Sequence, residues 1–262
     1  MQLDGRIIDR AVKWDLGVNF SLNRSKVLVL SEDKDIFGGE LDNTILKDQL
    51  NLMRVGEPMY VFYGYVEDGY DENGHIVYKN MDDDPAITAA DKTIIGDPNP
   101  DFLVNLTTAV SYKGFTLSAF FQSSIGNDIY SLSMAAQAYD YGYNGNTLRE
   151  VYYNHWTPEN PTAKYPNLDQ TSYKMSDRFV YDGSFVRLKN LELAYDVPCA
   201  RSKFIKRARV YVSAQNLFTI TSYPFWDPDI NANGGGSSMI QGVDSYCYPS
   251  ARTYTIGCRL TF

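Results

Sequence analysis

The chain has 262 residues with 24 basic and 32 acidic side chains, so its formal net charge is −8 and a nucleic-acid-binding domain, which needs a basic face, is excluded. Hydrophobic residues make up 44% of the chain, which excludes a disordered polyelectrolyte. Aromatic residues make up 14%, with 21 Tyr, and this composition is typical of surfaces that are partly apolar and partly wet.

Alternation of apolar and polar residues predicts about eight antiparallel β-strands. Residues 14–23 alternate without a break, and every second residue from Trp14 to Leu22 is apolar. Residues 45–54 and 60–66 are weaker candidates. The remaining candidates are residues 104–112, 115–122, 185–196, 208–219 and 253–262.

The connections between these strands fall into two classes. Lys113-Gly114 and residues 198–206 are short, whereas residues 67–101, 123–182 and 220–249 are long and rich in Gly, Asp, Asn and Tyr. Such long loops are uncommon in compact soluble domains, and short turns at one rim with long loops at the other are typical of outer-membrane barrels. Residues 129–139 predict a short helix inside the middle loop. A soluble β-sandwich, whose strands also alternate, is the alternative that this pattern leaves open.

A series of stretches, in order along most of the chain, resembles the C-terminal part of SusC/RagA-type TonB-dependent outer-membrane transporters. They are residues 55–58 with 62–65, 94–102, 112–115 with 120–122, 126–129, 156–161, 182–190, 210–219, 227–229 and 253–262. Each stretch is weak by itself, but their common order favours the barrel over the sandwich.

The resemblance implies an all-β fold, in which residues 1–262 form the C-terminal antiparallel strands of a large transmembrane β-barrel with long extracellular loops. It also implies that the plug domain, the signal peptide and the N-terminal barrel strands are absent from the sequence. The expected location is the cell outer membrane, in contact with the lipid bilayer.

The implied function is import of oligosaccharides, with a SusD-like surface lipoprotein as a lid and with energy from the TonB complex acting through the missing plug. Peptide import is the nearest variant, because related members carry peptides, and a soluble carbohydrate-binding β-sandwich is a second alternative. An enzyme is not expected, because the only histidines, His75 and His155, lie in polar loop sequence without a catalytic spacing.

Substrate contacts are expected from two kinds of residue. Polar partners in the alternation point to the lumen, and loop aromatics offer faces for stacking on sugar rings, although such aromatics also anchor loops or form interfacial belts. The lumen candidates are Asn19, Ser118, Gln122, Arg209, Gln215 and Arg259, and the loop candidates are Tyr141, Tyr143, Trp156, Trp226, Asp227 and Asn160.

No cofactor is expected, apart from a possible structural Ca²⁺ in the first long loop. Family members often have an Asp-x-Asn-Gly-Asp-Gly sequence where this chain has Asp71 and Asn73, and Asp91 could supply a further oxygen ligand. His75 replaces the next carboxylate, and an Asn-Gly turn beside a solvated acidic run is the alternative interpretation.

The final strand has a functional interpretation of its own. Its apolar stripe resembles the C-terminal signal by which the barrel-assembly machinery captures outer-membrane proteins, and it is also what an ordinary lipid-facing strand would show. The stripe consists of Tyr254, Ile256, Cys258, Leu260 and Phe262.

Overall fold

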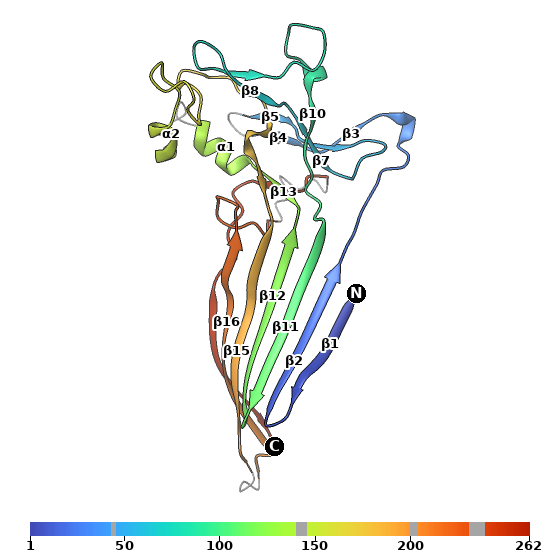
Figure 1. Cartoon of the computed structure of the whole chain (residues 1–262), viewed down its shortest axis with the longest axis vertical. Helices are drawn as coiled ribbons and strands as arrows, with labels where there is room; N and C mark the ends of the chain where they lie inside the picture. Colours follow the sequence, from blue (N-terminus) through green and yellow to red (C-terminus); the bar gives the residue numbers. More distant parts are fainter. Residues whose placement is uncertain (43–45, 140–145, 200–203, 231–238) are drawn as a thin grey trace.

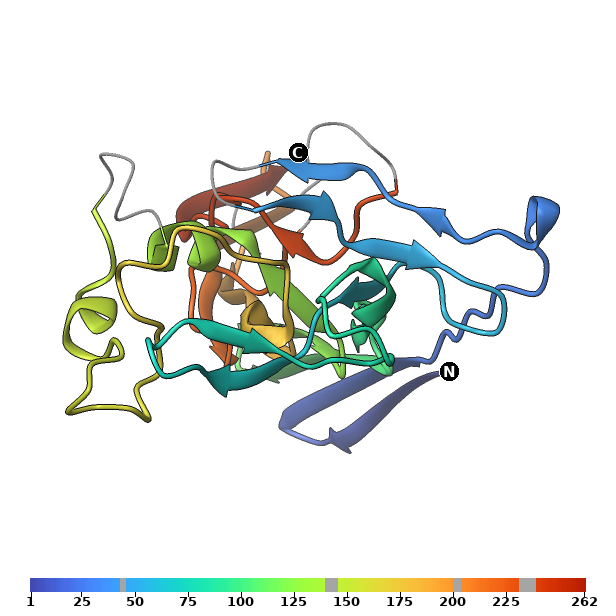
Figure 2. The ribbon, with the colours of Figure 1, turned by 90° about the horizontal axis from the view of Figure 1, so that it is seen from above.

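The computed structural model describes residues 1–42, 46–139, 146–199, 204–230 and 239–262. A tall antiparallel sheet stands below a layer of loops (Figure 1). Seen from above, the loop layer covers the ends of the strands and leaves the first hairpin outside (Figure 2). No helix among the described residues is long and apolar enough to cross a membrane.

Seven strands form the main sheet, in the order β1-β2-β11-β12-β15-β16-β18, with every neighbouring pair antiparallel. Their bounds are β1 Gln2–Asp9, β2 Val12–Ser21, β11 Phe102–Tyr112, β12 Phe115–Ile125, β15 Phe185–Val197, β16 Arg207–Thr221 and β18 Thr253–Thr261. Lys113 and Gly114, both with positive φ, make the tight β11–β12 turn that the sequence predicts.

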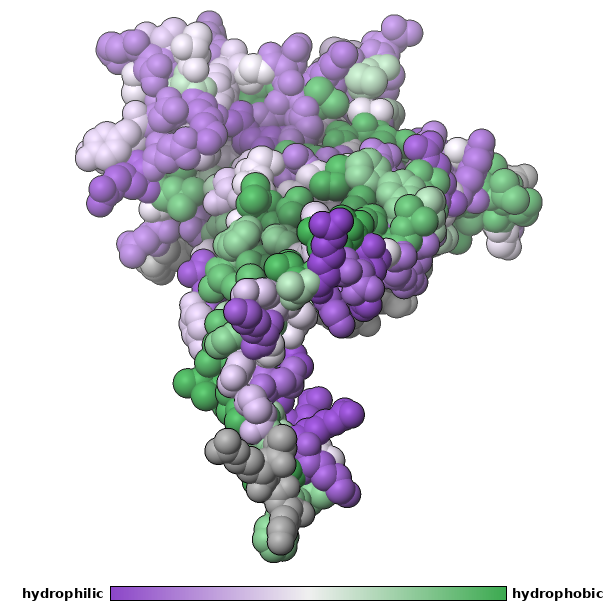
Figure 3. Space-filling model, turned by 60° about the horizontal axis from the view of Figure 1, so that its bottom comes forward, coloured by the Kyte–Doolittle hydropathy of each residue, from purple (hydrophilic) through white to green (hydrophobic). Residues whose placement is uncertain are grey.

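The register of the main sheet places apolar residues opposite apolar residues from strand to strand. The pairs on this face include Val18 with Leu106, Leu106 with Phe121, Leu117 with Leu193, Leu193 with Val212, and Val212 with Ile256. The face is exposed, and Ile256 is 86% accessible. Seen from below, apolar surface covers one flank of the strand region and polar groups gather on the other (Figure 3). An apolar outer band of this kind is typical of a lipid-facing barrel wall.

The opposite face of the sheet is polar and carries ion pairs between neighbouring strands. Arg6 Nε lies 2.8 Å from Asp15 Oδ1, and Arg209 Nη1 lies 3.2 Å from Asp196 Oδ2. One polar and one apolar face on a single tall sheet confirm the predicted barrel architecture. They do not fit the β-sandwich alternative, which needs a second large sheet packed on the apolar face.

The main sheet differs from the predicted set of strands in two places. β1 was not predicted, because a register shift between Arg6 and Ile8 breaks its alternation. The weak candidates 45–54 and 60–66 supply only short strands of the loop layer, so this sheet has seven strands, close to the predicted number of about eight.

The loop layer is built from short elements. In chain order they are η1 Ser31–Asp33, β3 Ile36–Phe37, β4 Glu40–Asp42, β5 Lys47–Gln49, β6 Asn51–Met53, β7 Val61–Gly64, β8 Glu67–Tyr70, β9 Ile76–Tyr78, η2 Ala89–Asp91, β10 Thr93–Gly96, β13 Asp128–Ser131, α1 Leu132–Tyr139, α2 Arg149–Tyr153, η4 Asp177–Phe179, β14 Val180–Asp182 and β17 Val243–Asp244. The helix predicted at 129–139 is present as α1, preceded by β13.

Most of the buried hydrophobic side chains lie in this loop layer and not in the main sheet. The core cluster includes Leu50, Phe62, Tyr130 and Val243, all fully buried. Because the apolar face of the main sheet is exposed and not packed on the loops, the loops fold around a hydrophobic core of their own.

Candidate functional site

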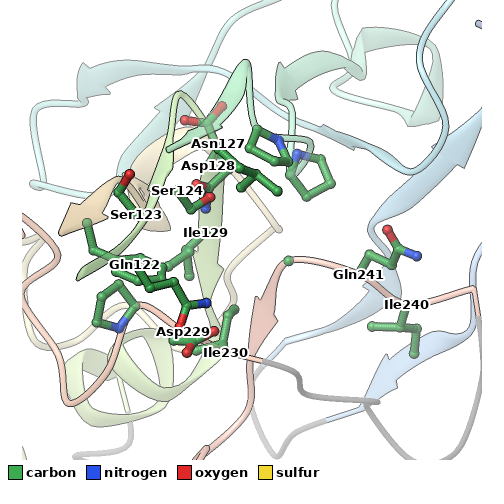
Figure 4. Close-up of a pocket in the computed structure, with 16 residues that line it drawn as sticks. Gln122, Ser123, Ser124, Asn127, Asp128, Ile129, Asp229, Ile230, Ile240 and Gln241 are labelled. Atoms are coloured by element: carbon green, nitrogen blue, oxygen red, sulfur yellow. Dashed lines mark hydrogen bonds between the residues drawn. The ribbon is translucent and has the colours of Figure 1, made fainter. Parts of the chain in front are cut away.

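A cavity of about 430 Å³ lies where the polar face of the main sheet meets the loop layer (Figure 4). Strands β11, β12, β13 and β15 and the connections before β11 and after β16 contribute to its wall. Its lining residues are Pro98, Pro100, Leu103, Gln122, Ser123, Ser124, Asn127, Asp128, Ile129, Phe185, Pro228, Asp229, Ile230, Ile240, Gln241 and Gly242.

A tight turn between β12 and β13 brings the polar side chains to this cavity. Gly126 has φ +85°, and a Cβ at this position would overlap the carboxylate of Asp101, so only glycine fits without strain. The backbone N–H of Gly126 donates to Ser184 Oγ at 2.9 Å, and Ser124 Oγ donates to Asn127 Oδ1 at 2.7 Å. The turn therefore holds Asn127 in one orientation beside the cavity.

Asp128 is a half-buried acid of the cavity wall. Its Oδ2 accepts the backbone N–H of Asp97 at 2.9 Å, and it stands opposite Asp182 in the β13–β14 pair. Burial raises the pKa of Asp128, and the carboxylates of Asp97 and Asp182 raise it further. The carboxyl group therefore lies in a negative local environment.

The far wall is anchored through Asn51 on β6. Its Nδ2 donates to the carbonyl oxygen of Gln241 at 3.0 Å, and its Oδ1 accepts the N–H of Gln241 at 3.3 Å. Gly242 has φ +71° and packs so closely on Pro98 that a Cβ would overlap the proline ring. These contacts join residues far apart in sequence into one wall.

Among the described residues, Arg187 is the largest fully buried side chain, and it stands opposite Gln122 of the cavity wall. Its guanidinium donates to Asp227 Oδ1, to Asp229 Oδ2 at 3.2 Å and to Thr219 Oγ1 at 2.9 Å. The arginine fastens the connection after β16 to the main sheet.

Asp227, a predicted substrate contact, is one of the partners of Arg187 and is only 8% exposed. Burial by itself would raise the pKa of Asp227, but hydrogen bonds from the N–H groups of Ser250 and Asp229 and from Arg187 outweigh burial and lower it. Its carboxylate is thus engaged in holding the loop.

The predicted aromatic contacts lie in different settings. Trp156 is buried beneath the β8–β9 turn, where Gly74 packs against its indole ring. Trp226 is 56% exposed and stacks on Phe225 with ring centroids 4.7 Å apart, so it remains accessible for a sugar ring. Tyr141 lies outside the described residues.

The predicted lumen residues of β16 lie on the polar face, below the cavity. Arg209 pairs with Asp196 and Glu192 of β15, and Gln215 is exposed opposite Asn190. Of the lumen candidates, Gln122 lines the cavity.

The predicted calcium ligands have backbone partners. Asp71 Oδ1 accepts the N–H groups of Asn73 and His75, which closes the β8–β9 turn, and these bonds contribute to lowering the pKa of Asp71. Asp91 accepts the N–H groups of Met81 and Thr88 and caps η2. Within the described part of the chain, no three His, Cys, Asp or Glu side chains are grouped to hold a metal ion.

The predicted assembly stripe is an exposed edge of the main sheet. Tyr254, Ile256 and Leu260 lie on the apolar face of β18, and Phe262 follows at its end, 71% exposed. These side chains are accessible for recognition.

The sequence did not single out Arg187, Asp128 or Asp229 as site residues. All three lie in stretches that carry the family resemblance, and this resemblance was the sequence signal that could have identified them as site residues. The bulge in β15, the turn after β12 and the fold of the connection after β16 place them around the cavity.

Comparison with known proteins gives relatives over nearly the whole chain, although no family model matches. TonB-dependent receptor P3 of Formosa agariphila is 31% identical over 98% of the chain, and TonB-dependent receptor SusC of Bacteroides thetaiotaomicron is 28% identical over 98%. The chain spans about a quarter of their length, 27% and 25% respectively.

Solved structures agree with the sequence relatives. The RagAB peptide transporter matches all of the chain with a TM-score of 0.79 and 26% identity, and the "closed-closed" RagAB peptide importer matches with a TM-score of 0.81 and 25% identity. The chain covers 28% and 29% of those chains. Sequence and fold together identify the chain as a member of the SusC/RagA-type TonB-dependent receptors of the outer membrane.

Proposed function

We propose that this chain forms part of the wall and loop layer of an outer-membrane importer for oligosaccharides. The importer is energised by the TonB complex and works with a SusD-like surface lipoprotein as its lid. No covalent bond is made or broken. The chain supplies a passage wall and contacts that hold the ligand as it enters.

The cavity between the polar face and the loop layer carries this proposal. Amides and carboxylates from Gln122, Asn127 and Asp128 lie among proline and isoleucine side chains. Such a mixture suits a ligand with many hydroxyl groups and weakly apolar ring faces, and exposed Trp226 adds a stacking surface.

Uptake by the native host tests the function. Deleting the complete gene is expected to abolish uptake of at least one oligosaccharide, and the wild-type gene should restore it. Unchanged uptake of every oligosaccharide in a broad panel would contradict the proposal.

Peptide import is the second candidate, since the RagAB structures are described as a peptide transporter and importer. Peptide mixtures belong in the same uptake panel. A deletion strain that loses peptide uptake and keeps oligosaccharide uptake would assign the protein to peptides.

The lipoprotein partner is tested separately. Affinity purification of the intact protein from native outer membranes should recover a SusD-like lipoprotein in about equal amount. Recovery of the protein alone under mild detergent conditions would count against a stable partner.

A further inference from the structure

The charges around the cavity are unbalanced. The six carboxylates in or next to its wall are those of Asp97, Asp101, Asp128, Asp182, Asp227 and Asp229. None of the described lining residues is Lys, Arg or His. In the sequence, the segment between Ile230 and Ile240 contains no charged residue.

Three cations of the described residues pair with these carboxylates. Arg187, with its side chain 2% exposed, binds Asp227 and Asp229. Lys189 Nζ lies 3.9 Å from Asp229 as well, and Arg24 Nη2 lies 4.0 Å from Asp101 on the exposed side. Among the described residues, an anionic ligand in the cavity would therefore meet carboxylates without a free lining cation to offset them.

The polar groups suit a ligand that donates hydrogen bonds. A carboxylate accepts only, and Asp128 uses Oδ2 for the N–H of Asp97. The side-chain amides of Gln122 and Gln241 can donate and accept. Hydroxyl and ammonium groups satisfy such a set, whereas sulfate and carboxylate groups bring only further acceptors.

Building on the proposed function, we propose that this cavity admits uncharged or amino-bearing sugar units and rejects units that carry sulfate or carboxylate. The cavity thus acts as a charge filter at the junction of loop layer and barrel wall. Within the described part of the chain, its selectivity arises from the excess of carboxylates, six against the three cations Arg187, Lys189 and Arg24, and from the unpaired carboxyl group of Asp128 in the cavity wall.

The test is an array of matched oligosaccharides, neutral, amino-substituted, uronic and sulfated, probed with the intact protein in detergent at low and physiological salt. Neutral and amino forms should be retained at least about tenfold better than anionic forms of the same backbone. The preference should weaken as salt rises.

Asp128→Asn removes one charge and keeps an acceptor for the N–H of Asp97. The variant should lose several-fold in affinity for amino sugars and gain for anionic ones, with neutral sugars little changed. Asp83→Asn, on the exposed acidic loop, is the matched control and should change none of them.

The outcomes separate the two proposals. Retention of sulfated or uronic oligosaccharides as strongly as neutral ones by the wild-type protein would overturn the charge filter and leave oligosaccharide import standing. Retention of no oligosaccharide would overturn the proposed function, and the filter with it.

Discussion

Tyr211 on β16 lies directly opposite Gly257 on β18, and its ring covers the bare backbone of that glycine. A Cβ at Gly257 would overlap the phenol ring. A tyrosine laid over a cross-strand glycine stabilises the pair, because the ring shields backbone that lacks a side chain. The contact joins the final strand to its neighbour on the polar face.

Gly257→Ala should therefore displace the ring of Tyr211 and destabilise the folded protein by about 0.2–1 kcal/mol, the contribution of a cross-strand pair. The folded fraction in outer membranes can be measured by the mobility shift of unheated samples in gels. Gly5→Ala is the matched control, because nothing lies within 4 Å of a Cβ there. Equal folded fractions for the two variants would refute the packing argument.

Arg187 gives a second prediction. Arg187→Met leaves the carboxylates of Asp227 and Asp229 without their buried cation and should cost about 3–5 kcal/mol. Limited proteolysis should then cut the connection after β16 faster than in the wild type.

The control for Arg187 is Arg6→Met, which removes an arginine from an exposed ion pair with Asp15. This variant should have proteolysis rates close to those of the wild type. If both variants behave alike, Arg187 does not hold the loop.

The pH dependence of stability should reveal that the charged form of Asp128 destabilises the fold. Its pKa is raised above the ordinary 3.8, so its charged form destabilises the fold at neutral pH, and the cost vanishes as the pH falls below about 4. Asp128→Asn should raise the thermal midpoint of the intact protein at pH 7, and the gain should shrink in acid.

The contribution of Asp227 to stability should change with pH in the opposite direction. Its pKa is lowered, so it stabilises the fold above about pH 4 and loses that contribution as the pH falls through its folded value. Asp227→Asn should lower the midpoint at pH 7. Circular dichroism melts at several pH values measure the thermal midpoints of Asp128→Asn and Asp227→Asn. Midpoint changes of the same sign at pH 7 would contradict the opposite pKa directions of the two residues.

Trp156 and Trp226, the two tryptophans of the loop layer, should separate stability from ligand binding. Trp156→Ala removes a buried indole and should destabilise the loop layer by about 3–5 kcal/mol. Trp226→Ala removes an exposed ring, so stability should hold while oligosaccharide affinity falls. Melting curves with binding titrations measure both, and a destabilised Trp226 variant with unchanged affinity would rule out the stacking role.

Deleting Phe262 tests the assembly signal. The residue is 71% exposed at the end of β18, so its loss should leave the folded sheet intact and lower the amount of protein in the outer membrane. Immunoblots of membrane fractions measure this, with Phe204, an exposed aromatic in the β15–β16 turn, changed to Ala as a control. An unchanged membrane level would argue against the signal.

Local patterning of the sequence was sufficient to predict six of the seven strands of the main sheet and, away from the bulges, their two faces. Along β2, each apolar residue from Trp14 to Phe20 lies on the exposed apolar face, as the alternation predicts. The period of a strand is two residues, so one unbroken run determines which side chains share a face. The tight turn at Lys113-Gly114 follows from the same local information.

The site depended on the tertiary structure. By alternation alone, Arg187 would share a face with Leu191 and Leu193, in the lipid. A register shift between Leu188 and Asn190 reverses the faces, so that Arg187 stands beside Gln122 on the polar side.

The same holds for the loops. Trp156 is an aromatic loop residue of the kind expected to contact a ligand, but it is buried against Gly74. Asp227 binds Arg187, which lies 40 residues away in sequence. The sequence determined what is local, namely strand periodicity and turn chemistry. The tertiary structure alone decided the bulge, the loop core and the charges that meet at the cavity, because these depend on contacts between residues far apart in the chain.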